Sequence, residues 1–164
     1  MITVRKRRRI EAKTDYKARI EMLKGNMPRV VFRKTNRYIT GQFVKSKEAQ
    51  DFVSIGVESR SLLEFGWPDG AKGSLKSLPA AYLTGFLLGK RILDKEGKIK
   101  AILDIGMQRS TPKSKMYAFL KGVVDSGVEI SCNEKMFPDE AKISGKNAKK
   151  EIPFKKIKEK IEKQ

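Results

Sequence analysis

The chain has no histidine and only one cysteine, Cys132, among its 164 residues. The lack of histidine excludes Ser-His and Cys-His nucleophiles, imidazole metal ligands and a histidine general base. A single cysteine can form neither an internal disulfide nor a structural zinc site, and it is typical of a reducing compartment. Enzymatic chemistry would have to depend on carboxylates, lysine or tyrosine, and we expect no metal, no other cofactor and no small-molecule substrate.

Long hydrophobic runs are missing as well. The longest apolar stretch, residues 83–88, is interrupted by Gly85 and is far shorter than a membrane span. The basic N-terminal residues lead into Glu11 and Asp15, whereas a secretory signal would continue into an apolar segment. We therefore expect a cytoplasmic protein with no membrane partner.

Positive charge is present in large excess, because 37 Lys and Arg residues against 19 Asp and Glu residues give a formal net charge of +18. Residues 1–24 and residues 142–164 each carry nine basic and three acidic side chains, while residues 25–141 carry nineteen and thirteen. Basic clusters serve in nuclear localisation signals and surface patches too. Two cationic ends on one body nevertheless favour binding to a dense polyanion such as nucleic acid.

The distribution of apolar residues predicts one folded domain between two basic extensions. Residues 1–13 are predicted as an extended arm, residues 14–140 as a single α/β domain, and residues 141–164 as a tail. Within the tail, apolar residues at helical spacing predict a weak amphipathic helix that forms on binding; these are Phe154, Ile157 and Ile161.

The first half of the domain predicts a short helix and an antiparallel meander. Thr14 is a candidate N-cap for a helix that ends near residue 24. Strand-like runs follow over residues 29–35, 37–44 and 52–57, joined by short polar links at 34–37 and 46–50.

The second half alternates helices and strands. An irregular segment at 59–78 contains Trp67, which we interpret as a loop anchor, the alternative being a base-stacking platform. Helices are predicted over 79–95 and from Pro112 to Gly127, and strands over 99–105 and 128–130. A strand that follows a helix pairs in parallel with an earlier strand. The order β-β-β-α-β-α-β therefore predicts a mixed α/β sheet flanked by helices.

Two catalytic interpretations are weak. The segment Gly85 to Lys90 has only three residues between its glycines, no Ser or Thr after the lysine, and a predicted helical position, so it favours close helix packing over a phosphate loop. The strand order resembles that of ribonuclease H-like nucleases, which bind two metals with carboxylates. However, the first strand carries no acid, and Asp104 and Asp125 alone do not make such a site.

The link between the first two strands is the clearest candidate for RNA contact. Basic hairpin tips also serve solubility, but arginine can bridge phosphates and tyrosine can stack on an unpaired base. The polar loop before the second long helix suits a phosphate oxygen, although helix capping explains it equally well. The residues concerned are Arg33, Lys34, Thr35, Asn36, Arg37 and Tyr38 in the link, and Arg109, Thr111 and Lys113 in the loop.

Five ordered motifs resemble the ribosomal protein L-eighteen family of archaeal and eukaryotic type. They are RRRIEAKTDYKAR at 7–19 with LKG at 23–25, PRVVFRKTNRYI at 28–39, FGW at 65–67, LPAAYLTG at 78–85 and AILDIG at 101–106. The resemblance covers about residues 5–140.

This resemblance implies a non-enzymatic protein with a ribonuclease H-like α/β fold. It would bind 5S rRNA in the central protuberance of the large ribosomal subunit and help to attach it to the large-subunit rRNA. Neighbouring ribosomal proteins, including the other 5S-binding protein, would be its further partners. The implied RNA contacts come from the arm, the next helix and the hairpin: Arg5, Lys6, Arg7, Arg8, Arg9, Lys13, Thr14, Tyr16, Lys17, Arg19, and Arg33 to Tyr38. A ribonuclease H-like nuclease and a chromatin-like DNA-binding protein are the alternatives.

Overall fold

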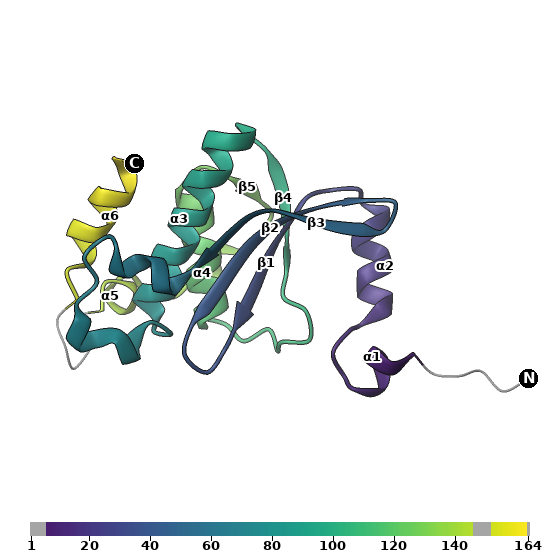
Figure 1. The fold of residues 1–164 in the computed structure, drawn as a ribbon, viewed down its shortest axis with the longest axis horizontal. Coiled ribbons are helices and arrows are strands. Elements are labelled where there is room, and N and C mark those ends of the chain that lie inside the picture. The colour runs from purple at the N-terminus through teal and green to yellow at the C-terminus, as the bar shows by residue number, and fades with distance from the viewer. Residues whose placement is uncertain (1–5, 146–151, 164) are drawn as a thin grey trace, which may run out of the picture.

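A five-stranded mixed sheet organises the molecule (Figure 1). The computed structural model describes residues 6–145 and 152–163. Antiparallel pairs join β1 to β2 and β2 to β3, whereas β4 runs parallel to β1 and β5 parallel to β4. The spatial order is β3-β2-β1-β4-β5, with strands β1 (Arg29–Lys34), β2 (Ile39–Lys47), β3 (Gln50–Glu58), β4 (Lys100–Asp104) and β5 (Glu129–Ile130). The predicted mixed α/β fold, an antiparallel three-strand meander followed by βα units, is confirmed.

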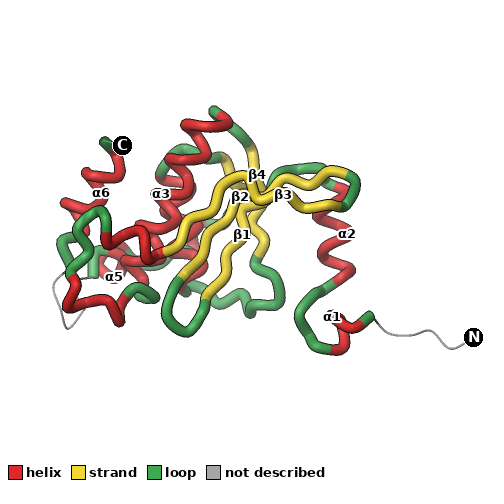
Figure 2. Tube along the Cα trace, viewed as in Figure 1, coloured by secondary structure: helices red, strands yellow, loops and turns green. Residues whose placement is uncertain are grey.

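The helices divide into two groups, which Figure 2 separates on either side of the strands. α3 (Leu78–Glu96), α4 (Lys115–Asp125), α5 (Glu140–Ile143) and α6 (Phe154–Glu162) gather with the core, while α1 (Arg7–Ile10) and α2 (Tyr16–Lys24) lie at the other end of the molecule. Three short 3₁₀ helices complete the described elements: η1 (Ser59–Leu63), η2 (Asp69–Ser74) and η3 (Glu134–Met136). None of the helices in the described ranges is long and apolar enough to cross a membrane.

Glycines allow α3 and α4 to approach closely. A Cβ atom at Gly85 would lie 2.1 Å from the carbonyl oxygen of Phe119, and one at Gly122 would lie 2.2 Å from that of Tyr82. These contacts explain why two glycines with low helix propensity stand inside helices. They confirm that residues 85–90 serve helix packing. The aromatic ring of Phe119 then reaches the sheet, where its centroid is 5.2 Å from that of Phe32.

Two positive-φ turns shift element boundaries from the predicted ones. Glu48 and Ala49 have φ angles of 50° and 62°, so β2 and β3 are joined by a two-residue turn, whereas a polar loop over 46–50 was expected. Lys113 has a φ of 57° and donates its amide to the carbonyl of Met136, so α4 begins at Lys115 and not at Pro112. Glutamate, alanine and lysine do not signal a left-handed backbone, which glycine and asparagine usually provide.

The N-terminal segment differs from the prediction in two respects. Residues 7–10 form a helical turn where an extended arm was expected, and Ala12 with a φ of 49° reverses the chain after it. The N-cap of α2 is Asp15, whose carboxylate accepts from the amides of Lys17 and Ala18; Thr14, the predicted cap, precedes it. α2 has no buried residue, so it does not use an apolar stripe for docking.

The C-terminal helix is part of the core. Ile157 and Ile161 of α6 are each 1% exposed and belong to the same hydrophobic cluster as α3. The predicted helix is confirmed, but the expectation that it forms on binding is wrong, because its apolar side packs on the folded body itself. The division into residues 1–13, 14–140 and 141–164 remains a prediction.

Trp67 is confirmed as a loop anchor, since it is buried and its Nε1 donates to the carbonyl of Ala71 at 3.1 Å.

Replacing Gly85 by Ala is expected to lower the free energy of unfolding by about 1–3 kcal/mol, because the new methyl group meets the backbone of Phe119. The gain in helix propensity, about 1 kcal/mol, is too small to offset that clash. Urea unfolding followed by circular dichroism measures the change. Gly73→Ala is the control, since a Cβ there meets nothing within 4 Å. An unchanged midpoint for Gly85→Ala would show that α3 and α4 are not held by this contact.

Candidate nucleic-acid interface

A buried arginine ties the sheet together beneath the basic surface. Arg29, the first residue of β1, is 2% exposed. Its guanidinium donates to Oδ2 of Asp104 at 3.3 Å, to Oδ1 of Asp51 at 2.5 Å and to Oγ of Ser46 at 2.9 Å. A buried charge is tolerated only when it is paired and hydrogen-bonded. The three partners therefore hold β1, β4 and the β2–β3 hairpin in one arrangement.

Asp104 also binds Arg33, one of the predicted RNA contacts. Arg33 donates to the Asp104 carboxylate at 3.2 Å and to its carbonyl at 3.1 Å. The amide of Gly106 donates to the same carboxylate at 2.8 Å, and a Cβ at Gly106 would lie 3.0 Å from the guanidinium carbon of Arg33. Arg33 is therefore fixed against the loop after β4, with its side chain still 43% exposed.

Arg19, another predicted contact, attaches α2 to the hairpin. It donates to Oδ2 of Asp51 at 2.8 Å and to the carbonyl of Ala49 at 3.4 Å. Burial acts to raise the pKa of Asp51, but hydrogen bonds from Arg19 and Ser46 and the charges of Arg29 and Arg19 outweigh it and lower that pKa. Asp51 thus stays ionised and joins α2 to the network around Arg29.

The remaining cations of the N-terminal segment are exposed and lightly engaged. Arg8 donates to Oγ1 of Thr14 at 2.9 Å, and the Lys6 ammonium lies 4.4 Å from the centre of the Tyr16 ring. Exposed contacts of this kind contribute little to stability, so an RNA phosphate can replace them. The other predicted cations comprise Arg7 and Lys13, which pair with Glu11, and Arg9 and Lys17, whose side chains have no partner within the described residues. Arg5 lies outside the described residues.

A basic cavity of about 260 Å³ lies between the N-terminal segment and strands β1 and β4. Its lining includes five of the predicted RNA contacts, namely Arg8, Lys13, Thr14 and Arg19 from the N-terminal segment and Arg33 from β1, and also the buried Arg29. Asp15 and Asp104 also line it. This arrangement can accept an anionic group such as a backbone phosphate, which the guanidinium and ammonium groups would bind.

The hairpin between β1 and β2 is closed by Thr35. Its Oγ1 accepts from the amide of Tyr38 and donates to the Tyr38 carbonyl, both at 2.9 Å. Tyr38 is half-buried and packs against the core. These two predicted contacts therefore shape the turn, and it is Lys34, Asn36 and Arg37 that stand exposed at the tip.

The loop after β4 lies at the same end of the sheet as this hairpin, because β1 and β4 are parallel (Figure 1). Arg109 and Thr111 are exposed there. The ammonium of Lys113 is already paired with Asp139 at 3.1 Å, and this pairing lowers the pKa of Asp139. The predicted residues thus fall into two groups, one that lines the basic cavity and one at the exposed tip of the β1–β2 hairpin and in the loop over residues 109–113.

Sequence reasoning missed Lys76 and Lys115 at this second group. Burial lowers the pKa of Lys115, and the charges of Lys34 and Lys76 lower it further, so these two lysines act electrostatically on Lys115. A signal was available, since Lys76 stands next to Ser77 and Lys115 next to Ser114, the N-caps of α3 and α4. Helix N-termini favour anions.

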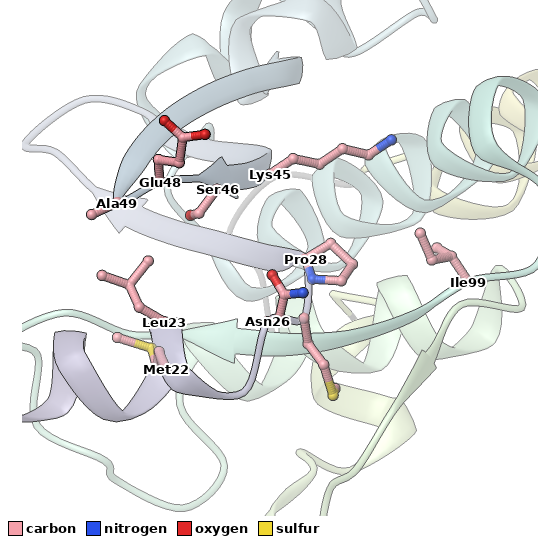
Figure 3. Close-up of a pocket in the computed structure, with 10 residues that line it drawn as sticks. Met22, Leu23, Asn26, Pro28, Lys45, Ser46, Glu48, Ala49 and Ile99 are labelled. Atoms are coloured by element: carbon pink, nitrogen blue, oxygen red, sulfur yellow. The ribbon is translucent and has the colours of Figure 1, made fainter.

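A second cavity, about 440 Å³ in volume, separates α2 from the β2–β3 hairpin. Figure 3 shows Met22 and Leu23 on one side and Ser46, Glu48 and Ala49 on the other. Lys45, also in its lining, pairs with Glu96 at 2.5 Å, and Glu48 adds negative charge. We therefore do not assign RNA binding to this cavity.

The acids considered for a nuclease have other roles. Asp104 pairs with Arg29 and Arg33, and Asp125 accepts a hydrogen bond from the Tyr82 hydroxyl at 2.7 Å. Burial and the Asp125 carboxylate raise the pKa of Tyr82. Across residues 6–145 and 152–163, no three acidic or cysteine side chains are grouped so that they could hold a metal ion. Both acids therefore hold other side chains of the fold in place.

Comparison with known proteins gives consistent matches over most of the chain. A family model described as "Ribosomal large subunit proteins 60S L5, and 50S L18" matches residues 2–98 and 93–133. A protein of Korarchaeum cryptofilum named "Large ribosomal subunit protein uL18" is 47% identical over 144 residues, which cover 88% of this chain and 71% of that protein. Proteins of the same name from Methanospirillum hungatei and Methanoculleus marisnigri are 41% identical (90% of this chain, 81% of theirs) and 42% identical (85% and 77%).

Replacing Asp104 by Asn is expected to lower the free energy of unfolding by about 3 kcal/mol, because the buried charge of Arg29 loses one of its two carboxylates. Thermal or urea unfolding measures the loss. The control is Asp94→Asn, an exposed acid with no ion-pair partner in the described ranges, for which we expect a change below about 0.5 kcal/mol. Equal stability of the two variants would show that the network around Arg29 does not hold β1, β4 and the β2–β3 hairpin together.

Proposed function

Because this chain belongs to the family of ribosomal large-subunit proteins 60S L5 and 50S L18, it is a structural protein of the large ribosomal subunit, and we propose that it binds 5S rRNA. It would help to attach this RNA to the large-subunit rRNA in the central protuberance. In this proposal it acts in the cytoplasm, within the ribosome. Its other partners are neighbouring large-subunit proteins, including the other 5S-binding protein.

The observation that carries the proposal is a folded body with accessible cations at two neighbouring places. At one, the N-terminal segment places Arg8 and Lys13 at a cavity that Arg29 also lines. At the other, Lys34 and Arg37 stand exposed at the tip of the hairpin. Irregular RNA is recognised by shape and by phosphate contacts, which such a frame can supply at fixed spacing.

In the proposed mechanism, the arm contributes to binding affinity, whereas the hairpin and the basic cavity determine where the RNA lies on the protein. Exposed cations of the arm would exchange their weak internal partners, such as Glu11, for RNA phosphates and release counterions. The hairpin and the basic cavity would fix the position of the RNA, because Thr35 closes the turn and Asp104 holds Arg33. An unpaired base near the hairpin can stack only on the exposed part of Tyr38, since the rest of that ring packs on the core.

The nuclease alternative receives no support from the acids. A two-metal mechanism requires carboxylates that are free to bind cations, and Asp104 is occupied by two arginines. The DNA-binding alternative differs in its prediction for duplex DNA, and the following experiment separates it from our proposal.

We expect the purified chain to prefer 5S rRNA. Labelled 5S rRNA is bound at about 0.15 M salt, where nonspecific phosphate binding is weakened, and is competed with unlabelled 5S rRNA, tRNA or duplex DNA. Only 5S rRNA should displace the label efficiently, with at least about a tenfold advantage in competitor concentration, because phosphate attraction alone does not distinguish the three. Equal competition by tRNA and DNA would contradict specific 5S recognition.

A further inference from the structure

The carboxyl end of the sheet collects positive electrostatic potential from backbone and side chains. Gly85 of α3 meets Phe119 of α4, and further along both helices Gly89 meets Ser126, so the two helices run in the same direction. Both N-termini therefore lie at one end, and neither helix has an acid in its first turn. Helix N-termini carry partial positive charge, and acids normally accompany them.

Three lysines from three separate elements stand at this end. Lys34 is the last residue of β1, Lys76 lies two residues before α3, and Lys115 is the first residue of α4. Lys34 and Lys76 are exposed, whereas Lys115 is partly buried, and its lowered pKa reflects that burial and the two neighbouring charges. No ion pair links any of the three to an acid among residues 6–145 and 152–163.

Acids that flank this end in the sequence are already occupied. Asp139 pairs with Lys113 at 3.1 Å and with Lys142 at 3.7 Å, and Asp69 pairs with Lys72 at 2.9 Å. Three like charges held together without a carboxylate repel one another, and an incoming anion relieves that repulsion. This contrasts with the arm, where Glu11 already partners Arg7 and Lys13.

We infer that Lys34, Lys76 and Lys115 form a second RNA-binding surface, the three-lysine patch, which holds backbone phosphates through the folded body and independently of the N-terminal segment. None of the three lines the basic cavity at Arg29. The inference rests on the proposed function, because it assigns RNA as the polyanion. It adds a contact that depends on the packing of α3 against α4, since that packing brings Lys76 and Lys115 to the hairpin.

The test uses the full-length chain with Lys34, Lys76 and Lys115 all replaced by Gln. The matched control replaces Lys47, Lys98 and Lys100 by Gln, which removes the same charge from exposed positions at the opposite end of the sheet. The dissociation constant for 5S rRNA is measured for both variants and the unchanged chain over a series of salt concentrations. Circular dichroism and thermal unfolding confirm that each variant is folded.

The patch variant should bind about 10- to 100-fold more weakly at 0.15 M salt, and its slope of log affinity against log salt should be smaller by about two to three. The control should change by less than about twofold. Equal losses in the two variants, or an unchanged patch variant, would overturn the patch while leaving 5S binding by the unchanged chain intact. Failure of the unchanged chain to prefer 5S rRNA would instead reject the proposed function.

Because Lys115 is partly buried, its replacement can also affect folding. If the triple variant is destabilised, the pair Lys34→Gln and Lys76→Gln is compared with the pair Lys47→Gln and Lys98→Gln, all four at exposed positions. The first pair should still bind more weakly than the second, by about 5- to 20-fold. Equal affinities in this comparison would likewise overturn the patch.

Discussion

The charge of Arg29 inside the sheet is the constraint on which the arrangement of the basic elements depends. A buried guanidinium is unfavourable unless carboxylates surround it, and the two that do so come from distant parts of the chain. Asp104 then fixes Arg33, and Asp51 fixes Arg19 and with it α2. Removing either acid would therefore disturb more than one ion pair. The network replaces an apolar contact for α2, which has no buried residue.

Much of the fold could be predicted because periodicity reports local structure. The alternation of strands, the apolar stripe of α4 and the glycines of α3 all depend on neighbours within a few residues. The boundaries at Ala49 and Lys113 could not be predicted, since both residues adopt positive φ angles that their side chains do not favour. The docking of α6 was also unpredictable, because a short helix gains stability from the surface on which it packs, here that of α3, and the sequence pattern does not identify this surface.

The site was predictable in composition but not in geometry. Runs of Lys and Arg identify a polyanion-binding protein, yet they do not distinguish a free cation from a paired one. Arg33 and Lys34 are adjacent in the sequence, but Arg33 is held by an acid 71 residues away while Lys34 has no partner in the described part of the chain. Conversely, Lys76 and Lys115 are far apart in the sequence, and the packing of α3 against α4 places both at the end of the sheet where β1 ends at Lys34. Pairing across the chain, which sequence patterns do not encode locally, decides which cations remain available.

The position of α6 has a consequence for the order in which the protein can mature. Ile157 and Ile161 complete a cluster whose other members begin at Val30, so the part of α3 that α6 covers stays open until the chain has been synthesised beyond residue 161. Nascent chains with open apolar surfaces are prone to aggregate and attract chaperones. The body thus reaches its final packing only after translation of this segment, although the sheet and both long helices are already present. Productive assembly into a larger particle would then follow release of the C-terminal segment from the synthesising ribosome.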